Sequence, residues 1–217
     1  MFMTSAALLL ALITGTGVSI ESRTLAPRGP KPEGVNLVLN ERIVTGGGFV
    51  FLGRIVGLDG SIGFSQAEYK MDGTPVSISQ EGFWSDRWNH FETRYGKKGT
   101  EQQINEKTTR ADLPDSKFRN PTLLWFWKTQ PKPQTSVTVT SLAQNVIRTS
   151  QIEYTYEGDE EMTLAGRKVT VHRVREVPLS AAEGVYTIWW YDDQGMGVRR
   201  YHKTPENEYT DELVAWH

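Results

Sequence analysis

The side chains best suited to metal binding or acid–base chemistry are the four histidines and the carboxylates near them. His172 and His202 fall on neighbouring expected strands, so their rings can approach each other, with Glu176 or Asp192 completing a metal site. Their spacing matches no HExxH motif or other ligand pattern. We therefore expect these histidines at the surface or at the rim of a pocket, with no bound metal and no cofactor.

The segment from Glu81 to Tyr95 mixes aromatic rings with carboxylates, among them Asp86 and Glu92. Such a mixture resembles a carbohydrate cleft, in which two acids flank the glycosidic bond. Local sequence does not give the separation of the two acids, and aromatic clusters in β-proteins are more often core. A sugar-directed hydrolase is therefore the third function class, behind the two binding functions described below.

Other catalytic and phosphate-binding patterns are missing from the sequence. Gly46-Gly47-Gly48 matches neither GxGxxG nor GxxxxGK[ST], and a strand signal begins at Phe49, where a phosphate site needs a helix N-terminus. We expect a hairpin turn there. Ser65, Ser85 and Ser141 occupy no GxSxG elbow. We expect a protein that is not an enzyme.

Composition narrows the class of protein further. The 217 residues suit one domain, and the absence of Cys excludes disulfides, Cys-ligated metal sites and a thiol nucleophile. Aromatic residues make up 11% of the chain, so large rings must supply much of the core. The net charge is −2 with acids and bases interspersed, which makes nucleic acid an unsuitable partner.

The tract from Met162 to Lys203 carries the clearest strand signal in the chain. It reads as three strands, Lys168 to His172, Val185 to Tyr191 and Val198 to Lys203, built from Val, Tyr, Trp and Ile. Asp192-Asp193-Gln194-Gly195 supplies the turn after the second strand. This β-meander signature indicates antiparallel β-structure.

Strand signals recur at short intervals in the rest of the chain. We expect further strands at residues 35–40, 49–56, 62–69, 75–79, 89–95, 101–109, 137–139 and 151–156. Turns are expected at residues 96–99 and 158–161. The apolar run from Pro121 to Lys128 is either a buried strand or a short helix, because periodicity does not separate the two in so short a run.

The spacing of these strands predicts the fold class. Turns every ~8–12 residues favour a sheet that curls on itself, since a flat sheet of ten or more strands is unusual. The sequence therefore predicts an all-β fold with minor α content, built as a single strongly curved antiparallel sheet or an incomplete β-barrel.

The N-terminal residues have features of a secretory signal. The apolar run from Ala6 to Ile13 is long enough for the core of a signal peptide and shorter than the ~20 residues that span a bilayer. Gly17-Val18-Ser19 offers a cleavage site before Ile20, although no basic residue precedes the run. We expect residues 1–19 to be cleaved, with a retained membrane anchor or a cytosolic N-terminal helix as alternatives.

Three segments follow from this assignment. Residues 1–19 are the signal, residues 20–34 form a proline-rich extended leader, and residues 35–217 form a single antiparallel β domain. The mature protein is then periplasmic or secreted and has no stable membrane span.

Four motifs in the second half carry a resemblance to known proteins. They are the polar strand at residues 151–157, TLAGRKV at 163–169, WWYDD at 189–193 and GVRRY at 197–201. On these motifs, residues 120 to 205 resemble a group of uncharacterised exported bacterial proteins, domains of unknown function that are similar to the lipoprotein carriers LolA and LolB. The resemblance implies a strongly curved antiparallel sheet, an incomplete barrel that a short helix or loop closes. It supplies no catalytic residues, and the lack of Cys departs from the lipoprotein members.

These observations favour an exported, soluble, non-enzymatic protein of the cell envelope. A curled sheet with large aromatic residues on its concave face favours an apolar ligand, such as a lipid or an acyl chain. The expected ligand-binding residues are Phe91, Trp125, Trp127, Tyr154, Trp189 and Tyr191. The alternative from another class is a structural or assembly module that acts through contacts with an envelope protein partner.

The adjacent residues Trp189 and Trp190 test whether the meander belongs to the core. Consecutive side chains on a strand point to opposite faces of the sheet. If the sheet curls around a core, at least one of these two indole rings must be deeply buried.

Overall fold

The computed structural model describes residues 17–24, 36–45, 47–56, 61–84, 86–118, 131–142, 149–193, 195–206 and 208–216. These residues form fourteen β-strands and one short 3-10 helix, η1 (Asp115–Lys117). The strands are β1 (Gly17–Thr24), β2 (Asn36–Thr45), β3 (Gly48–Val56), β4 (Ile62–Lys70), β5 (Pro75–Trp84), β6 (Arg87–Tyr95), β7 (Thr100–Ile104), β8 (Lys107–Ala111), β9 (Thr135–Leu142), β10 (Thr149–Leu164), β11 (Arg167–Pro178), β12 (Tyr186–Tyr191), β13 (Gly197–Lys203) and β14 (Glu208–Trp216).

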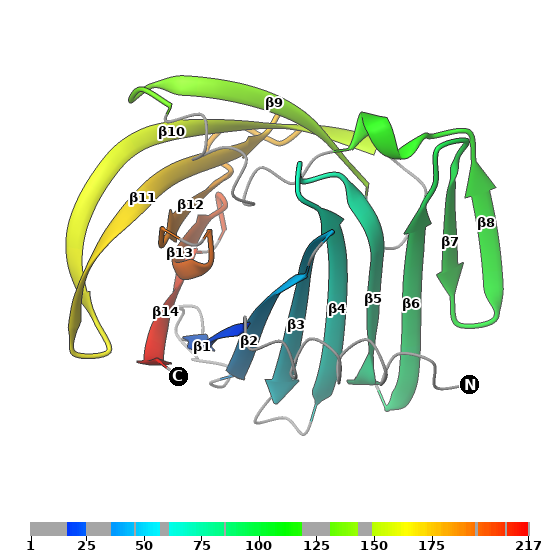
Figure 1. Ribbon diagram of the computed structural model, residues 1–217, viewed down its shortest axis with the longest axis horizontal. Coiled ribbons are helices and arrows are strands. Elements are labelled where there is room, and N and C mark those ends of the chain that lie inside the picture. Colours follow the sequence, from blue (N-terminus) through cyan, green and yellow to red (C-terminus); the bar gives the residue numbers. More distant parts are fainter. Residues whose placement is uncertain are drawn as a thin grey trace.

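All fourteen strands belong to one antiparallel sheet. Its order is β8-β7-β6-β5-β4-β3-β2-β1-β14-β13-β12-β11-β10-β9. Each strand therefore pairs with its neighbour in the chain, except β8 with β9, and β1 also pairs with β14. The two edge strands, β8 and β9, are consecutive in the chain, and the described residues show no ladder between them. The sheet is strongly curved (Figure 1), which confirms the predicted all-β class and incomplete barrel.

The electrostatic influence of one tyrosine on tyrosines of distant strands shows which face lies inside the curve. Burial raises the pKa of Tyr95 on β6 and of Tyr154 on β10, and the nearby phenol of Tyr69 on β4 adds to both shifts. In the sheet, β4 and β10 are separated by β3, β2, β1, β14, β13, β12 and β11. Tyr69 therefore reaches Tyr154 only across the interior of the curved sheet.

Among the described residues, Phe118 lies between the two edges of the sheet, directly after η1. Phe118 makes an isolated parallel bridge to Thr140 on β9, and its ring lies 5.1 Å from that of Tyr95 on β6. The short helix η1 and Phe118 thus lie between the two edges, and the barrel stays incomplete. The helix is of the 3-10 type, and the structure shows no α-helix among the described residues.

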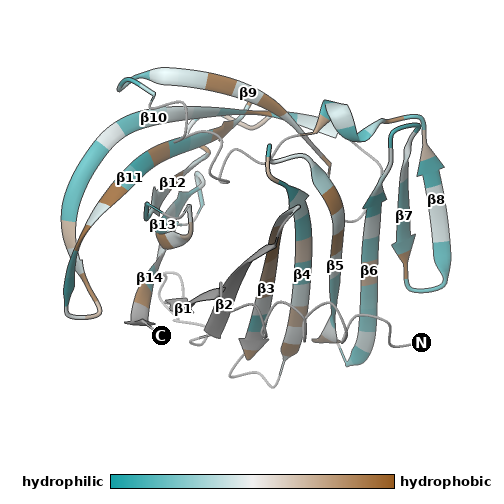
Figure 2. Cartoon of the chain, in the orientation of Figure 1, coloured by the Kyte–Doolittle hydropathy of each residue, from teal (hydrophilic) through white to brown (hydrophobic). Residues whose placement is uncertain are grey.

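Hydrophobic and hydrophilic bands alternate along β4 to β6 (Figure 2), because successive side chains of a strand face opposite sides of the sheet. The strand β12 is different, since it is buried on both faces. Trp190 is only 8% exposed and belongs to a cluster with Leu164, Val171, Ile188, Met196, Val198 and Leu213. Trp189 packs against a second cluster, formed by Val139, Tyr154, Tyr156, Val174 and Tyr191. The prediction for the two adjacent tryptophans is confirmed.

The glycine-rich turn at residues 46–48 is a hairpin, as predicted. Thr45 at the end of β2 pairs with Gly48 at the start of β3, which leaves two residues in the turn. Gly48 has a further packing role, since a Cβ atom there would collide with the backbone carbonyl of Tyr69. A phosphate-binding loop is therefore not present at this position.

The turn predicted at Gly158 to Glu161 is wrong. These residues lie inside β10, and Gly158, with φ of +132°, marks a shift of register against β11. The turn between β10 and β11 is made by Ala165 and Gly166, which have φ of 45° and 78°. Such positive values fit a two-residue hairpin turn, and Gly158 introduces a bulge that a sequence reading mistakes for a turn.

Two further differences concern hairpins. The expected polar strand over residues 101–109 is two strands, β7 and β8, because Asn105 adopts φ of 51° and starts a turn at residues 105–106. Asparagine tolerates this left-handed conformation better than most residues, so it can replace glycine in a tight turn. No strand was expected after Lys203, yet β14 follows and pairs with both β13 and β1.

The N-terminal assignments are tested only in part. Residues 1–16 and 25–35 lie outside the described residues, as do residues 119–130 with the apolar run at 121–128. The expected leader is wrong at residues 20–24, which belong to β1 and pair with β2 and β14. Val18 and Ile20 alternate with Ser19 and Glu21, which is a strand period that the preceding apolar run obscures. Cleavage before Ile20 stays a prediction.

Candidate functional site

The strongest candidate site is a carboxyl group held among aromatic rings on the inner face of β10 to β13. The side chain of Glu176, on β11, accepts a hydrogen bond of 2.7 Å from the indole Nε1 of Trp189 on β12. It also accepts a hydrogen bond from the phenol of Tyr154, its direct cross-strand neighbour on β10. Two aromatic side chains thus hold one carboxyl group from two adjacent strands.

Burial shifts the titration of Glu176 towards higher pH. Burial raises the pKa of this carboxyl group, and the hydrogen bonds from Trp189 and Tyr154 and the positive charge of Arg200 lower it by a smaller amount. Because burial penalises the charged form, an acid in this environment holds its proton to higher pH than an exposed one. A protonated Glu176 has both a donor and an acceptor to offer to a bound molecule.

Stacked rings surround this carboxyl group. The rings of Trp189 and Tyr191 are stacked with centroids 5.7 Å apart, and the guanidinium carbon of Arg200 lies 5.3 Å from the centre of the Trp189 ring. Gly197 on β13 faces them, and a Cβ atom there would come within 3.3 Å of the Trp189 ring. The glycine therefore makes room for the indole. We call Tyr154, Glu176, Trp189, Tyr191 and Arg200 the interior aromatic site.

The structure brings together three of the six residues that the sequence predicted to bind a ligand. Tyr154, Trp189 and Tyr191 lie in the interior aromatic site. Phe91 lies elsewhere, on β6, where its ring stacks on that of Trp84 with centroids 6.4 Å apart. The other two residues, Trp125 and Trp127, lie outside the described residues.

Sequence reasoning missed the polar members of this site. Glu176 was considered only as a metal ligand, and Arg200 was noted only as part of the GVRRY motif. One signal for Glu176 was present in the sequence, because it alternates with His172 and Val174 along a strand and so shares their face. Which face of that strand is buried depends on contacts with β10 and β12, and these contacts are not visible in the sequence.

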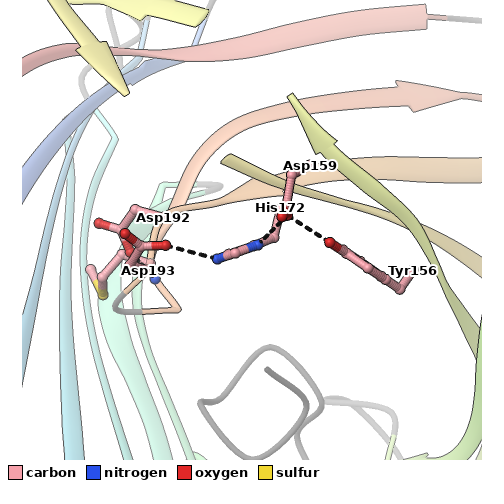
Figure 3. A network of polar contacts seen from close by, with 6 residues as sticks. Tyr156, Asp159, His172, Asp192 and Asp193 are labelled. Atoms are coloured by element: carbon pink, nitrogen blue, oxygen red, sulfur yellow. Dashed lines mark hydrogen bonds and ion pairs between the residues drawn. The ribbon is translucent and has the colours of Figure 1, made fainter. Parts of the chain in front are cut away.

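A second polar cluster joins the β10–β11 hairpin to the turn after β12 (Figure 3). Asp159 Oδ1 accepts a hydrogen bond from the Tyr156 hydroxyl at 2.6 Å and lies 2.6 Å from His172 Nδ1. The other ring nitrogen of His172 lies 3.0 Å from Asp193 Oδ1. In the turn, the backbone N–H of Met196 donates to Asp192 Oδ1 at 2.9 Å.

The electrostatics of this cluster suggest a structural role. Burial alone raises the pKa of Asp159, but the hydrogen bonds from Tyr156 and His172 outweigh it and lower the pKa overall. The carboxylate is therefore stabilised in its charged form, next to the bulge at Gly158. The cluster ties β10 and β11 to the β12–β13 turn at the point where the hairpin register shifts.

We expect Asp159→Asn to lower the free energy of unfolding by about 1 kcal/mol, because half the side chain is exposed and water screens its charge. A group with a lowered pKa in the folded state contributes stability above its unfolded pKa of about 3.9 and loses it as the pH falls through the folded pKa. Urea unfolding at neutral and acidic pH measures both effects. Asp193→Asn is the matched control: its side chain is 82% exposed, so its loss must be smaller.

The histidine arrangement considered from the sequence is not formed. His172 binds Asp159 and Asp193, and His202 Nδ1 lies 2.9 Å from the hydroxyl of Thr187. Among the described residues, no group of three or more His, Asp and Glu side chains is placed to hold a metal ion. In the same part of the chain, no helix is long and apolar enough to cross a membrane.

The acids of the segment from Glu81 to Tyr95 have other roles. Glu92 makes two hydrogen bonds, of 2.8 and 2.9 Å, to the guanidinium of Arg94. Asp86 is exposed and adopts φ of 60° between β5 and β6. One acid is thus part of a surface ion pair, and the other belongs to a turn.

Comparison with known proteins supports the fold. A β-barrel-like protein of domain of unknown function DUF1849 from Brucella abortus superposes with a TM-score of 0.67 and 12% identity, over 93% of this chain and 96% of that one. The hypothetical lipoprotein YmcC from Escherichia coli gives a TM-score of 0.37 and 9% identity over 99% and 97%. No protein-family model and no curated protein sequence matches.

The first of these likenesses defines the class of fold. The chain has a β-barrel-like fold of the kind seen in the Brucella abortus protein, whose domain is of unknown function. The YmcC likeness is too weak to carry an argument. A resemblance to LolA and LolB in particular is not shown by these comparisons.

Proposed function

We propose that this chain is an exported, non-enzymatic protein of the cell envelope that binds an apolar or amphipathic molecule, such as a lipid or an acyl chain, at the interior aromatic site. The observation that carries the proposal is the arrangement of Tyr154, Trp189 and Tyr191 around Glu176 on the inner face of the curved sheet. Apolar lining with a few convergent polar groups is typical of small-molecule sites.

Two further features support this proposal. The sheet is open between β8 and β9, where the described residues contribute only the bridge from Phe118 to Thr140. An open edge is a natural entry to the inner face of a barrel. The apolar run at residues 6–13 supports export, and the likeness to LolA and LolB, carriers of lipoproteins, is part of the same proposal.

Titration of delipidated protein with a monomeric fluorescent fatty acid tests the proposal. We expect saturable binding, and we expect Trp189→Ala to weaken it about tenfold or more, because aromatic side chains at the centre of a site carry much of the binding energy. Leu179→Ala is the control. Leu179 is 54% exposed and lies outside the interior aromatic site, so its loss leaves fatty-acid binding unchanged.

The negative outcome is equally clear. If the delipidated wild-type chain takes up neither fatty acids nor monomeric phospholipids across a broad panel, the binding function is refuted. Native mass spectrometry of protein purified from its own host adds an independent readout, since a bound small molecule appears as a defined increase in mass.

A second candidate function is an assembly module, and the edge strand β9 favours it. Edge strands are commonly protected by charged residues. Strand β8 carries the exposed Lys107 and Arg110, whereas β9, TSVTVTSL, contains no charged residue. Such an edge is suited to pairing with a strand of another chain. In the mass spectrometry experiment, a co-purified protein chain supports assembly and a co-purified small molecule supports the carrier.

A further inference from the structure

A row of exposed hydrophobic side chains crosses four strands on the outer face of the sheet. Val56 on β3 pairs with Ile62 on β4, Ile62 pairs with Phe83 on β5, and Phe83 pairs with Trp88 on β6. Paired residues lie side by side on the same face. We call these four residues the outer row; they are 51%, 43%, 41% and 55% exposed, respectively.

The outer row lies at one end of these strands. Val56 is the last residue of β3, Ile62 is the first of β4, and Phe83 and Trp88 stand next to the connection between β5 and β6. Phe64, 42% exposed, adds a fifth hydrophobic side chain in the next row of β4. A row at the end of a sheet can touch a flat surface without the rest of the sheet intervening.

Polar and charged residues of both signs border the outer row. The next row along the strands pairs Arg54 with Phe64, Phe64 with Glu81, and Glu81 with His90. Glu81 Oε2 lies 3.9 Å from His90 Nδ1. Arg54 and Glu81 thus place a cation and an anion beside the same hydrophobic row.

The size of the exposed surface distinguishes a protein partner from a lipid bilayer as the molecule that binds there. Five half-exposed side chains present an area on the order of 400 Å², within the range of about 300–600 Å² for the largest patch on a typical monomer, which is often functional. A stable protein interface buries about 800 Å² on each partner, roughly twice that area. A bilayer surface makes no such demand, because a few side chains can insert among the headgroups while the rest of the protein remains in water.

The chemistry of the row fits a lipid surface. Tryptophan is enriched at membrane interfaces because its ring is apolar and its N–H is polar, and Trp88 is the most exposed member of the row. Neighbouring charges of opposite sign are complementary to a zwitterionic headgroup, which carries one phosphate and one ammonium. We propose that the outer row docks the protein peripherally on a zwitterionic phospholipid bilayer. This site is separate from the interior aromatic site.

Co-sedimentation of the full chain with phosphatidylcholine vesicles tests the proposal. We expect the wild type to partition onto the vesicles, with little dependence on salt because apolar insertion dominates. The double substitution Phe83→Ser and Trp88→Ser should lower the partition coefficient at least about tenfold, since loss of roughly 60 Å² of apolar burial gives that factor. Met71→Ser with Leu179→Ser is the matched control.

The control changes two side chains that are also exposed, 41% and 54%, but that lie outside the outer row. It should leave the partition coefficient unchanged. The docking proposal is overturned if the wild type does not partition, or if both double variants lose binding equally. Sedimentation velocity without vesicles tests whether the outer row is instead a protein interface. A wild-type dimer that the double variant Phe83→Ser and Trp88→Ser no longer forms would identify it as one.

Discussion

Trp190→Ala is expected to lower the free energy of unfolding by about 3–5 kcal/mol, the range for removing a buried tryptophan side chain. Trp190 lies in the cluster with Leu164 and Val171, both of which are almost fully buried. Its indole N–H donates a hydrogen bond to Glu160, and Arg173 and Arg199 lie over its ring at 5.7 and 5.0 Å.

Because small domains are stable by only about 5–15 kcal/mol, this single change removes a large part of the total. Urea unfolding monitored by circular dichroism measures it. Trp190→Phe is the informative partner, since it keeps an aromatic ring and removes the indole donor to Glu160. It should cost less than the alanine variant.

Trp189→Ala provides the comparison on the opposite face of β12. Its ring is only half-buried, so the loss should be smaller than at Trp190. Losses that are small and equal at the two positions would mean that β12 does not belong to the core. A large loss at Trp189 alone would mean that the interior aromatic site, rather than the Trp190 cluster, carries the stability of this strand.

The class of fold was accessible from local sequence because strand period and turn chemistry are local properties. The meander from β11 to β13 follows directly from alternating Val, Tyr and Trp residues and from the turn at residues 192–195. Prediction failed where a residue type is compatible with two local backbone structures. Gly158 was read as a turn and forms a bulge, and Asn105 was read as strand and forms a turn.

The pairing of β1 with β14 shows a different limit. It joins the two ends of the described chain, and nothing in either segment identifies the other as its partner. Without that pairing, the strands form only a series of sequential hairpins, and it is not defined which face of the sheet lies inside. For this reason the aromatic residues of the site were predicted by type, whereas the convergence of Glu176 and Arg200 upon them was not.

The outer row marks a related limit. Val56 and Ile62 occur in expected strands, and Phe83 and Trp88 occur in the aromatic-rich segment from Glu81 to Tyr95; such large apolar residues are normally assigned to the core. Only the register across four strands shows that they share a face, and only burial shows that this face is open. Both are properties of the folded sheet.

The second large effect is expected at Glu176, through the dependence of stability on pH. Burial raises the pKa of this carboxyl group in the folded protein above its unfolded value of about 4.3. Between the unfolded and the folded pKa, the folded state therefore binds more protons than the unfolded state. Stability must fall as the pH rises through that window and then stay at the lower level.

Glu176→Gln removes the ionisable proton and keeps a carbonyl oxygen that accepts from the Trp189 indole. Near about pH 3, where the wild-type carboxyl group is protonated in both states, we expect the two proteins to have similar free energies of unfolding. The variant should then become the more stable one, gaining up to about 1.4 kcal/mol for each pH unit across the window. Urea unfolding at steps from about pH 3 to about pH 8 measures this divergence.

Trp189→Phe tests the cause of the shift independently of the charge change. The indole N–H stabilises the charged carboxylate and so opposes the effect of burial. Its removal should raise the folded pKa of Glu176 further and extend the loss of stability to higher pH, while the Glu176→Gln background abolishes that extension. If the stability of the wild type is flat over this range, or if Glu176→Gln keeps the same slope, Glu176 is not the buried acid that the inner face of the sheet holds among its aromatic rings.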